Sequence, residues 1–365
     1  MSFIAPPNLQ RGDTVYLCAP AKAIEENYVL AAEKWLQAMG LVAIRSEHLL
    51  NQHHYFSGTT MERLTDFQVG LDHPVAKAIW CVRGGYGSIQ ILDGLQWAGF
   101  LRDPKWIIGF SDICVIHHKI QALGYQSVHG TMALNLEKNS AAAKHRLIEV
   151  LNGTNNSFEI ERHSANKLGE AEGILVGGNL SILYSMLAAP ECYQFEGSIL
   201  FIEDLAEHLY HIDRMLFALN KAGALNKILG LIVGGITDLE DTDTPFGIEL
   251  EEIILSPSLT YGSHIDGFEK LKKAPLLSVI HLLVINLLWG SLAVAVNLIQ
   301  SSHVVPVHPE LDWVELFVSV VGASNEKDGS ITGGGAELPP PPPQLERINV
   351  EARIYSESFF IIIVL

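Results

Sequence analysis

The feature of this sequence that most constrains its fold is the tetrapeptide Gly-Phe-Ser-Asp at 109–112, which separates two segments of different periodicity. The apolar run 106–110 predicts a strand, and the pattern over 112–123 predicts a helix. A serine at such a corner holds its hydroxyl clear of both elements, beside the N–H groups of the first helical turn. This arrangement is typical of a nucleophile for acyl transfer. The alternative is an ordinary helix cap, because Ser and Asp are common before an apolar helix.

Strand and helix patterns alternate on both sides of this corner. Further strands are expected at 14–19, 41–45, 76–80, 198–202 and 228–236, and helices at 25–39, 60–71 and 208–222. Strands separated by helices of this length form parallel βαβ units. The sequence therefore predicts an α/β fold: an N-terminal open parallel-sheet domain of the flavodoxin or Rossmann type, with a nucleophile elbow, and a second, smaller α/β domain. Functional loops are expected at the carboxyl ends of the strands.

The turn-rich segment after residue 151 marks a domain boundary. We expect a nucleophile-bearing domain over 1–155, a linker over 156–170 and a second domain over 171–300, followed by a tail of low order over 301–365.

Four further motifs accompany the Gly-Phe-Ser-Asp corner in order along the chain: Arg-Gly-Gly-Tyr-Gly at 83–87, His-Gly-Thr-Met at 129–132, Gly-Gly-Asn-Leu at 177–180 and Glu-Asp at 203–204 after an apolar strand. Together the five motifs resemble the LD-carboxypeptidase family of serine peptidases, which also includes the microcin-immunity hydrolases. The resemblance covers about 9–255. Thr131 stands where the family has proline.

The resemblance implies a catalytic triad. Ser111 would be the nucleophile, and Glu203 the carboxylate that orients a histidine base, since a serine hydroxyl needs such a base to attack an amide. The family histidine follows the glutamate by several tens of residues, and His264 lies 61 residues after Glu203. Without the resemblance, Glu203 would be interpreted as a solvated loop carboxylate and His264 as an exposed loop residue.

Three histidines within the matching region are alternatives for the base. His117 and His118 lie a helical turn or more beyond the corner and should point away from the serine. By the resemblance, His129 lines the site without being the base.

The glycine-rich segment predicts a ligand-binding loop. Backbone N–H groups at Gly84 and Gly85 can approach a ligand closely, and with that of Asp112 they would form an oxyanion hole. Arg83 is suited to a substrate carboxylate, and Tyr86 belongs to the same loop. A phosphate cradle is the competing interpretation, but the loop lacks both the Gly-Lys-Ser/Thr ending and the Gly-x-Gly-x-x-Gly spacing of nucleotide-binding loops.

Charge and composition exclude several classes of protein. With 24 basic and 41 acidic residues the formal net charge is −17, which argues against a nucleic-acid partner. The four cysteines lack CxxC spacing, no His-Glu-x-x-His motif is present, and the N-terminus has no secretory pattern. We expect a cytoplasmic enzyme without metal or cofactor, and the resemblance implies a homodimer.

The character of the chain changes after Leu255. From 274 to 309 there is no Asp, Glu, Lys or Arg, and the apolar stretch 275–299 is long enough to span a membrane. A glycine triplet and five consecutive prolines then predict that 325–344 is extended or disordered. Three interpretations remain open: a membrane anchor, a divergent core of the second domain, or an altered reading frame from near Ser256. In the last case the chain lacks its proper general base.

The predicted function is a serine carboxypeptidase that cleaves the amide bond to the terminal D-amino acid of a murein tetrapeptide. Ser111, His264 and Glu203 would act through an acyl-enzyme. One alternative is a microcin-type peptidyl-nucleotide hydrolase on the same scaffold. Others are a catalytically dead peptide-binding homologue and an interaction protein anchored in the membrane through 275–299.

Overall fold

The computed structural model describes residues 3–154 and 170–255. It also describes the backbone of five short strands further along the chain: β9 (Leu276–Val279), β10 (Val284–Ile285), β11 (Ala293–Ile299), β12 (Glu315–Val321) and β13 (Ile362–Val364). The extended or disordered segment predicted at 325–344 lies outside the described residues, as do 275, 280–283 and 286–292 of the apolar stretch 275–299.

The first domain is a parallel sheet of five strands extended at one edge. The strands are β1 (Thr14–Cys18), β2 (Val42–Arg45), β3 (Ala76–Cys81), β4 (Trp106–Gly109) and β5 (Val128–His129). They lie in the order β5-β4-β3-β1-β2, and β13 pairs antiparallel with β5. This is the flavodoxin-type order, in which the chain reverses direction across the sheet between β1 and β3. The predicted α/β class is confirmed.

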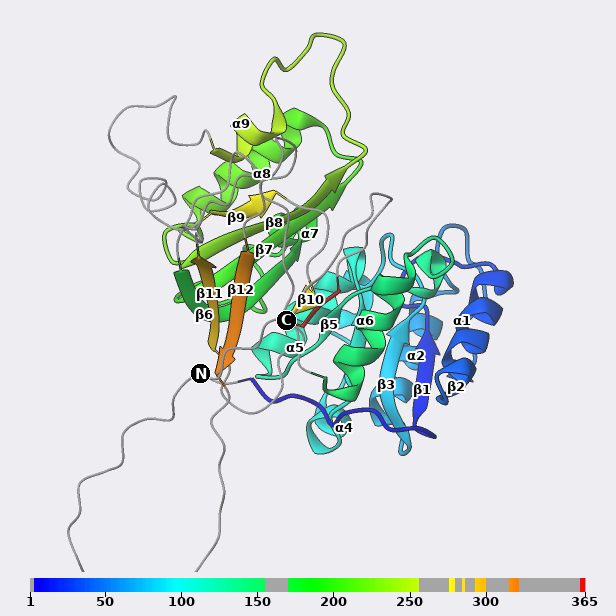
Figure 1. The fold of residues 1–365 in the computed structure, drawn as a ribbon. Coiled ribbons are helices and arrows are strands. Elements are labelled where there is room, and N and C mark those ends of the chain that lie inside the picture. The colour runs from blue at the N-terminus through cyan, green and yellow to red at the C-terminus, as the bar shows by residue number, and fades with distance from the viewer. Residues whose placement is uncertain are drawn as a thin grey trace, which may run out of the picture.

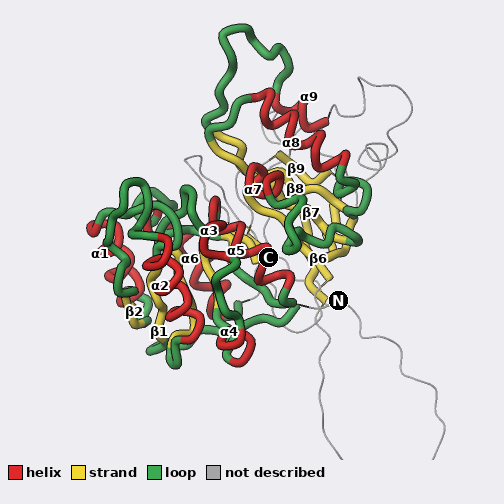
Figure 2. Tube along the Cα trace, turned by 180° about the vertical axis from the view of Figure 1, so that it is seen from behind, coloured by secondary structure: helices red, strands yellow, loops and turns green. Residues whose placement is uncertain are grey.

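Helices cover both faces of this sheet (Figures 1 and 2). They are α1 (Glu26–Ala38), α2 (Thr60–Asp72), α3 (Ile89–Leu92), α4 (Ala98–Arg102), α5 (Cys114–Ala122) and α6 (Ala141–Asn152), with 3-10 turns η1 (Ser111–Ile113) and η2 (Ala133–Asn135). Their ends follow local chemistry: Thr59 and Glu62 form a capping box before α2, and Gly153 ends α6 in a left-handed conformation.

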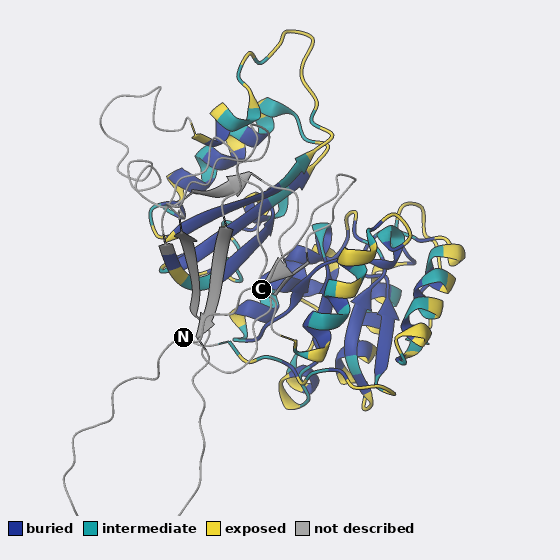
Figure 3. Ribbon diagram, viewed as in Figure 1, coloured by how far each residue is buried: buried dark blue, intermediate teal, exposed yellow. Residues whose placement is uncertain are grey.

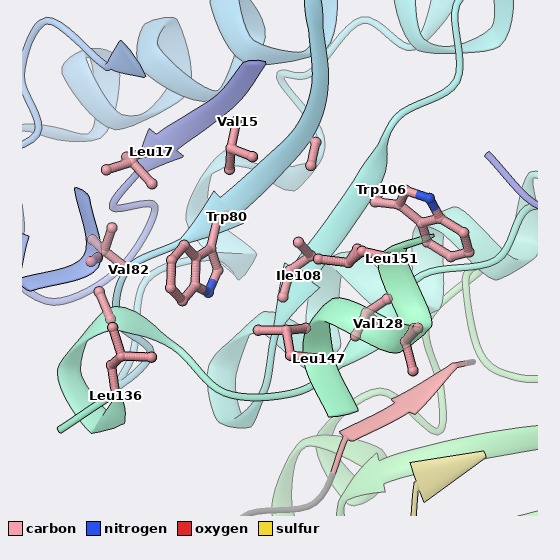
Figure 4. Close-up of a cluster of buried hydrophobic side chains, with 14 of the residues drawn as sticks. Val15, Leu17, Trp80, Val82, Trp106, Ile108, Val128, Leu136, Leu147 and Leu151 are labelled. Carbon is pink, nitrogen blue, oxygen red and sulfur yellow. The ribbon is translucent and has the colours of Figure 1, made fainter. Parts of the chain in front are cut away.

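Strand β1 shows why two layers of helices are needed. Its residues alternate between faces, so Val15 and Leu17 enter one apolar cluster while Tyr16 and Cys18 enter another. Figure 4 shows the first cluster, in which Trp80 of β3 lies among residues of β1, β4 and α6. Because both faces are apolar, both must be covered, and β1 is buried along its whole length (Figure 3).

The second domain is a smaller sheet with helices on one face. Its strands are β6 (Glu170–Asn179), β7 (Ser198–Leu205) and β8 (Gly230–Thr237), and its helices are α7 (Leu180–Ser185), α8 (Leu209–Lys221) and α9 (Leu250–Leu255). Strands β6, β7, β8 and β9 are parallel, whereas β11 and β12 extend the β6 edge in antiparallel orientation.

The two domains share one apolar cluster. On β7, Leu200 and Ile202 pack with α7 and α8, whereas Ile199 and Phe201 on the opposite face belong to the same cluster as Val128 of the first domain. One face of the second sheet is therefore covered by its own helices, and the other face is covered by the first domain. This contact fixes where the carboxyl ends of the two sheets lie relative to each other.

Truncation of this shared cluster should destabilise the whole protein. Phe201 is fully buried, so Phe201→Ala should lower the free energy of unfolding by about 3–5 kcal/mol in a denaturant titration. Leu205 on the same strand is 55% exposed and provides the control, because Leu205→Ala should change stability by at most about 0.5 kcal/mol. Equal effects of the two substitutions would contradict the shared core.

Candidate active site

Ser111 occupies the corner between β4 and α5. Its φ is +60°, a left-handed backbone conformation that costs a non-glycine residue about 1–3 kcal/mol. The preceding Phe110 is extended, and η1 begins at Ser111 itself. The predicted strand-to-helix corner is therefore present, and its strained serine has the backbone expected of a nucleophile elbow.

The glycine loop presses directly on this corner. A Cβ atom on Gly84 would lie 3.2 Å from the Ser111 Cβ, so a larger residue would push the loop off the serine. On the other side, His117 donates from Nε2 to the Gly109 carbonyl at 2.9 Å. The corner is thus held from both sides, as a strained backbone requires.

Asp112 ties the corner to the glycine loop through its side chain. The carboxylate is almost completely buried, and its Oδ2 accepts the backbone N–H of Ser88 at 2.8 Å. Burial raises the pKa of Asp112. Sequence reasoning assigned only the backbone N–H of this residue to an oxyanion hole, and that role stays a prediction.

Arg63 is a buried support of the loop that the sequence analysis missed. Its Nη1 donates to the carbonyls of Pro20 and Gly87, at 2.9 Å each, and its Nη2 donates to Gln90. Burial lowers the pKa of the guanidinium. The available signal was its place on the buried face of α2, four residues before Phe67.

The loops that follow β1 and β3 meet where the strand order reverses. Arg83 donates from Nη1 to the Ala23 carbonyl at 2.8 Å, and the Lys22 N–H donates to the Gly84 carbonyl at 3.3 Å. The neighbouring Tyr86 is half exposed. This edge is where doubly wound sheets bind ligands, and Arg83 and Tyr86 lie on it as predicted.

The His-Gly-Thr-Met turn is held by hydrogen bonds from two buried side chains. Trp80 donates from Nε1 to the Thr131 carbonyl at 2.8 Å, and Asn139 donates to the Thr131 hydroxyl at 2.5 Å. The threonine that departs from the family pattern is therefore fully buried and satisfied.

The turn places His129 between the two domains. His129 pairs with Gly109 of β4, two residues before the serine. Its Nδ1 lies 3.5 Å from the Cys114 Sγ, and its Nε2 lies 3.6 Å from Glu203 Oε1 of the second domain. Burial holds the pKa of His129 well below its usual range, so the ring is neutral.

Glu203 lies within a strand, at an irregular point. The prediction that the strand ends at Ile202 was wrong, because β7 continues to Leu205. The pairing of β7 with β8 shifts register between Ile202 and Asp204, where one residue of β7 faces two of β8, so Glu203 lies opposite a bulge in β8. Such bulges are common beside active sites. Burial, together with the neighbouring Asp204 carboxylate, raises the pKa of Glu203 to about 8.

Asp204 holds the Gly-Gly-Asn-Leu turn. Its Oδ1 accepts from the Asn179 side-chain amide at 3.0 Å, and its Oδ2 accepts the Ser181 N–H at 2.8 Å. The Asn179 oxygen in turn caps α7 by accepting from Ile182. The second residue of the Glu-Asp pair therefore positions the start of this helix.

The other histidines considered as the base are His117, His118 and His264, and the first two are fully buried. His118 stacks on Tyr193 with ring centroids 3.7 Å apart. Burial lowers the pKa of His117 to about 4 and that of His118 to about 3. His264, the predicted base, lies outside the described residues.

Neither a metal-binding cluster nor a membrane-spanning helix is present in the described part of the chain. No group of three or more His, Cys, Asp or Glu side chains there is arranged to hold a metal ion. Among the same residues, no helix has both the length and the apolar character needed to cross a bilayer.

Two family models match this chain. The model of the LD-carboxypeptidase N-terminal domain matches 15–130, and that of the LD-carboxypeptidase C-terminal domain matches 172–261. The chain belongs to the LD-carboxypeptidase family of serine peptidases. The family predicted from the five motifs is confirmed.

Two relatives in this family are named as murein peptide carboxypeptidases. A probable murein peptide carboxypeptidase of Bacillus subtilis is 33% identical over 255 residues, covering 68% of this chain and 80% of its own. The murein tetrapeptide carboxypeptidase of Pseudomonas aeruginosa is 30% identical over 252 residues, covering 64% of this chain and 80% of its own. A carboxypeptidase of this family is therefore the supported activity.

Solved structures agree with the fold. A muramoyltetrapeptide carboxypeptidase from Oxalobacter formigenes superimposes with a TM-score of 0.65 at 22% identity, covering 78% of this chain and 94% of its own. The microcin C7 self-immunity protein in complex with aspartyl sulfamoyl adenosine gives 0.62 at 20% identity, covering 75% of this chain and 89% of its own.

The raised pKa of Glu203 predicts a pH-dependent cost in stability. The pKa is about 8 in the folded chain against an ordinary 4.5, so the folded state binds more protons than the unfolded state between these values. The contribution of Glu203 to stability therefore falls as the pH rises from about 4.5 to about 8. Glu203→Gln cannot ionise, and its unfolding free energy relative to wild type should rise across this window by a few kcal/mol, at about 1.4 kcal/mol per pKa unit.

Denaturant titrations at several pH values measure this difference. Glu196→Gln, at an exposed position of the same domain, is the control and should follow the wild-type curve. A Glu203→Gln difference that stays constant from acid to mildly alkaline pH would show that this carboxyl group is not perturbed.

Proposed function

We propose that this chain is a serine LD-carboxypeptidase that removes the terminal D-amino acid from murein tetrapeptides, with Ser111, His264 and Glu203 as its triad. The observation that carries the proposal is the left-handed Ser111 corner, with the glycine loop packed against it. A strained serine is retained at a corner where it is needed for chemistry, since a helix cap has no use for the strain.

The reaction proceeds through an acyl-enzyme. The Ser111 Oγ attacks the scissile carbonyl while His264 takes its proton, and the histidine then returns that proton to the leaving D-amino acid. The oxyanion is stabilised by N–H groups of Gly84, Gly85 and Asp112. Water activated by the same histidine hydrolyses the acyl-enzyme.

Glu203 orients the histidine base and stabilises its positive charge. Glu203 lies on β7 opposite a bulge in β8, and its Oε1 lies 3.6 Å from the His129 Nε2. Its neighbour His129 is unsuited to be the base, because one ring nitrogen faces Cys114 and the other faces Glu203. This geometry supports a separate base, for which His264 is the candidate.

Substrate recognition is assigned to the loops at the β1/β3 edge. A carboxypeptidase must bind the free carboxylate of its substrate, and Arg83 brings a guanidinium to this edge. Two of the relatives at 30% identity or more carry murein peptide names and others are named putative carboxypeptidases, whereas the microcin-immunity structures lie near 20%. The murein peptide is therefore preferred over an aminoacyl-nucleotide as substrate. We place the enzyme in the cytoplasm as a homodimer that acts in peptidoglycan recycling.

Substitution of the elbow serine should separate activity from stability. Both Ser111→Ala and Ser111→Gly should abolish release of D-alanine from murein tetrapeptide, because each removes the nucleophile. The glycine variant should be the more stable of the two by roughly 1 kcal/mol, since glycine adopts a left-handed backbone without the Cβ clash. Activity in either variant, with wild-type thermal melting, would exclude Ser111 as the nucleophile.

The triad predicts a matched set of losses in the full-length chain. Glu203→Gln should lower kcat by about 10³–10⁴-fold, and His264→Ala should lower it at least as far. Asp204→Asn is the control at the neighbouring position, because its carboxylate holds α7 and its loss should act mainly on stability.

The assay compares murein tetrapeptide with an aminoacyl-nucleotide conjugate. A loss below about tenfold in Glu203→Gln would make this residue a structural carboxylate. A wild-type chain that hydrolyses neither substrate would contradict the triad and favour an altered reading frame after 255. Faster hydrolysis of the conjugate would favour the microcin-type activity.

A further inference from the structure

A line of buried polar contacts joins the nucleophile helix to Glu203. Cys114 is the first residue of α5, three residues after Ser111, and its Sγ lies 3.5 Å from the His129 Nδ1. The other ring nitrogen of His129 lies 3.6 Å from Glu203 Oε1. On the far side of the thiol, the backbone N–H of Asn179 donates to Sγ at 3.3 Å. The contacts therefore cross from one domain to the other twice.

The site is shaped to receive the thiol. A Cβ on Gly178 would lie 2.7 Å from the Cys114 Sγ and 3.3 Å from the His129 Nδ1, so only glycine leaves room for this contact. Glu203 Oε1 is buried and has no hydrogen-bond partner among the described residues. A buried carboxylate oxygen needs a donor, and the His129 Nε2 lies 3.6 Å from Glu203 Oε1.

The chemistry of the thiol indicates which group donates and which accepts at each of these contacts. A thiol has one hydrogen to donate, and with the sulfur accepting the Asn179 N–H, donation of that hydrogen to the His129 Nδ1 uses both capacities of the group. Burial raises the pKa of Cys114 and lowers that of His129, which keeps the thiol protonated and the imidazole neutral. With Nδ1 as acceptor, the single ring proton is on Nε2 and points toward Glu203.

We propose that Cys114 and His129 are positioning residues for Glu203: the Cys114 thiol selects the Nε2–H tautomer of His129, which donates to Glu203 Oε1 and fixes the carboxylate for the catalytic base. The proposal rests on the triad proposed above for its catalytic meaning. Its structural content, the tautomer and the donated hydrogen bond, does not depend on the triad.

The arrangement would serve two purposes. A donor on Oε1 favours the ionised carboxylate, which the histidine base requires and which burial and the neighbouring Asp204 oppose. The ionisable groups that face Glu203 are Asp204 of its own strand, His129 from β5 and Cys114 from α5. The same thiol also aligns the elbow helix with the second domain.

Two substitutions at Cys114 separate the donor from the space it fills. Cys114→Ser keeps both a hydrogen for Nδ1 and an oxygen that accepts the Asn179 N–H. Its kcat should therefore stay within about threefold of wild type, and the midpoints of its pH profile should not move. Cys114→Ala removes the donor. Its kcat should fall roughly tenfold with little change in KM, as expected when the tautomer that donates to the Glu203 carboxylate is no longer fixed. The acid limb of its kcat/KM profile should move to higher pH, because Glu203 then ionises less readily.

A second measurement does not depend on activity. In the full-length chain labelled with ¹⁵N-histidine, two-dimensional NMR spectra of the ring nitrogens distinguish the two tautomers. We expect Nε2–H at His129 in wild type and Cys114→Ser, and loss of that preference in Cys114→Ala. Melting temperatures of the three proteins verify that each is folded.

The outcomes distinguish this inference from the triad. An Nδ1–H tautomer in the wild type, or a Cys114→Ala variant with wild-type tautomer and pH profile, would overturn the positioning role while leaving the triad intact. The expected tautomers in a wild-type chain that hydrolyses no peptide would uphold the hydrogen-bonded line and refute the triad.

Discussion

The left-handed backbone at Ser111 is the constraint on which the rest of the site depends. A residue with a side chain does not remain at a φ of +60° unless its surroundings leave it no other choice. Here the Gly84 backbone lies against the serine, and Asp112 fastens the far end of the loop through Ser88. The hydrogen bond from His117 to Gly109 holds the end of the strand. Each contact is buried, so water cannot substitute for it.

The loop that covers the serine depends in turn on a buried cation. Arg63 donates to the carbonyl of Gly87 and to that of Pro20 in the neighbouring loop, and its guanidinium lies 4.6 Å from the Phe56 ring. A planar fork with five donors can satisfy several carbonyls at once, which a lysine ammonium cannot do with the same geometry. The loop can therefore stay fixed in place although three of its five residues are glycines.

The second domain contributes its carboxylate through a rigid contact. Phe201 packs into the first-domain cluster on one face of β7, and two residues later Glu203 lies on the same face, with its Oε1 3.6 Å from the His129 Nε2. Because the apolar cluster and the polar contacts lie on the same strand, the domains cannot shift without disturbing both. The site is thus assembled across a boundary that behaves as a single core.

The sequence by itself determined the elements and the family. Strand and helix periods are local properties, so the strands on either side of Ser111, the glycine loop and the order of the motifs could be inferred from short segments. The positions of Arg63, His129, Cys114 and Asp204 were decided only by the tertiary structure. Their roles arise from burial and from hydrogen bonds between segments far apart in the chain, and the bulge opposite Glu203 arises from the pairing of β7 with β8. Local pattern specifies which face of an element is apolar, but only the packed chain determines which buried polar group meets which partner.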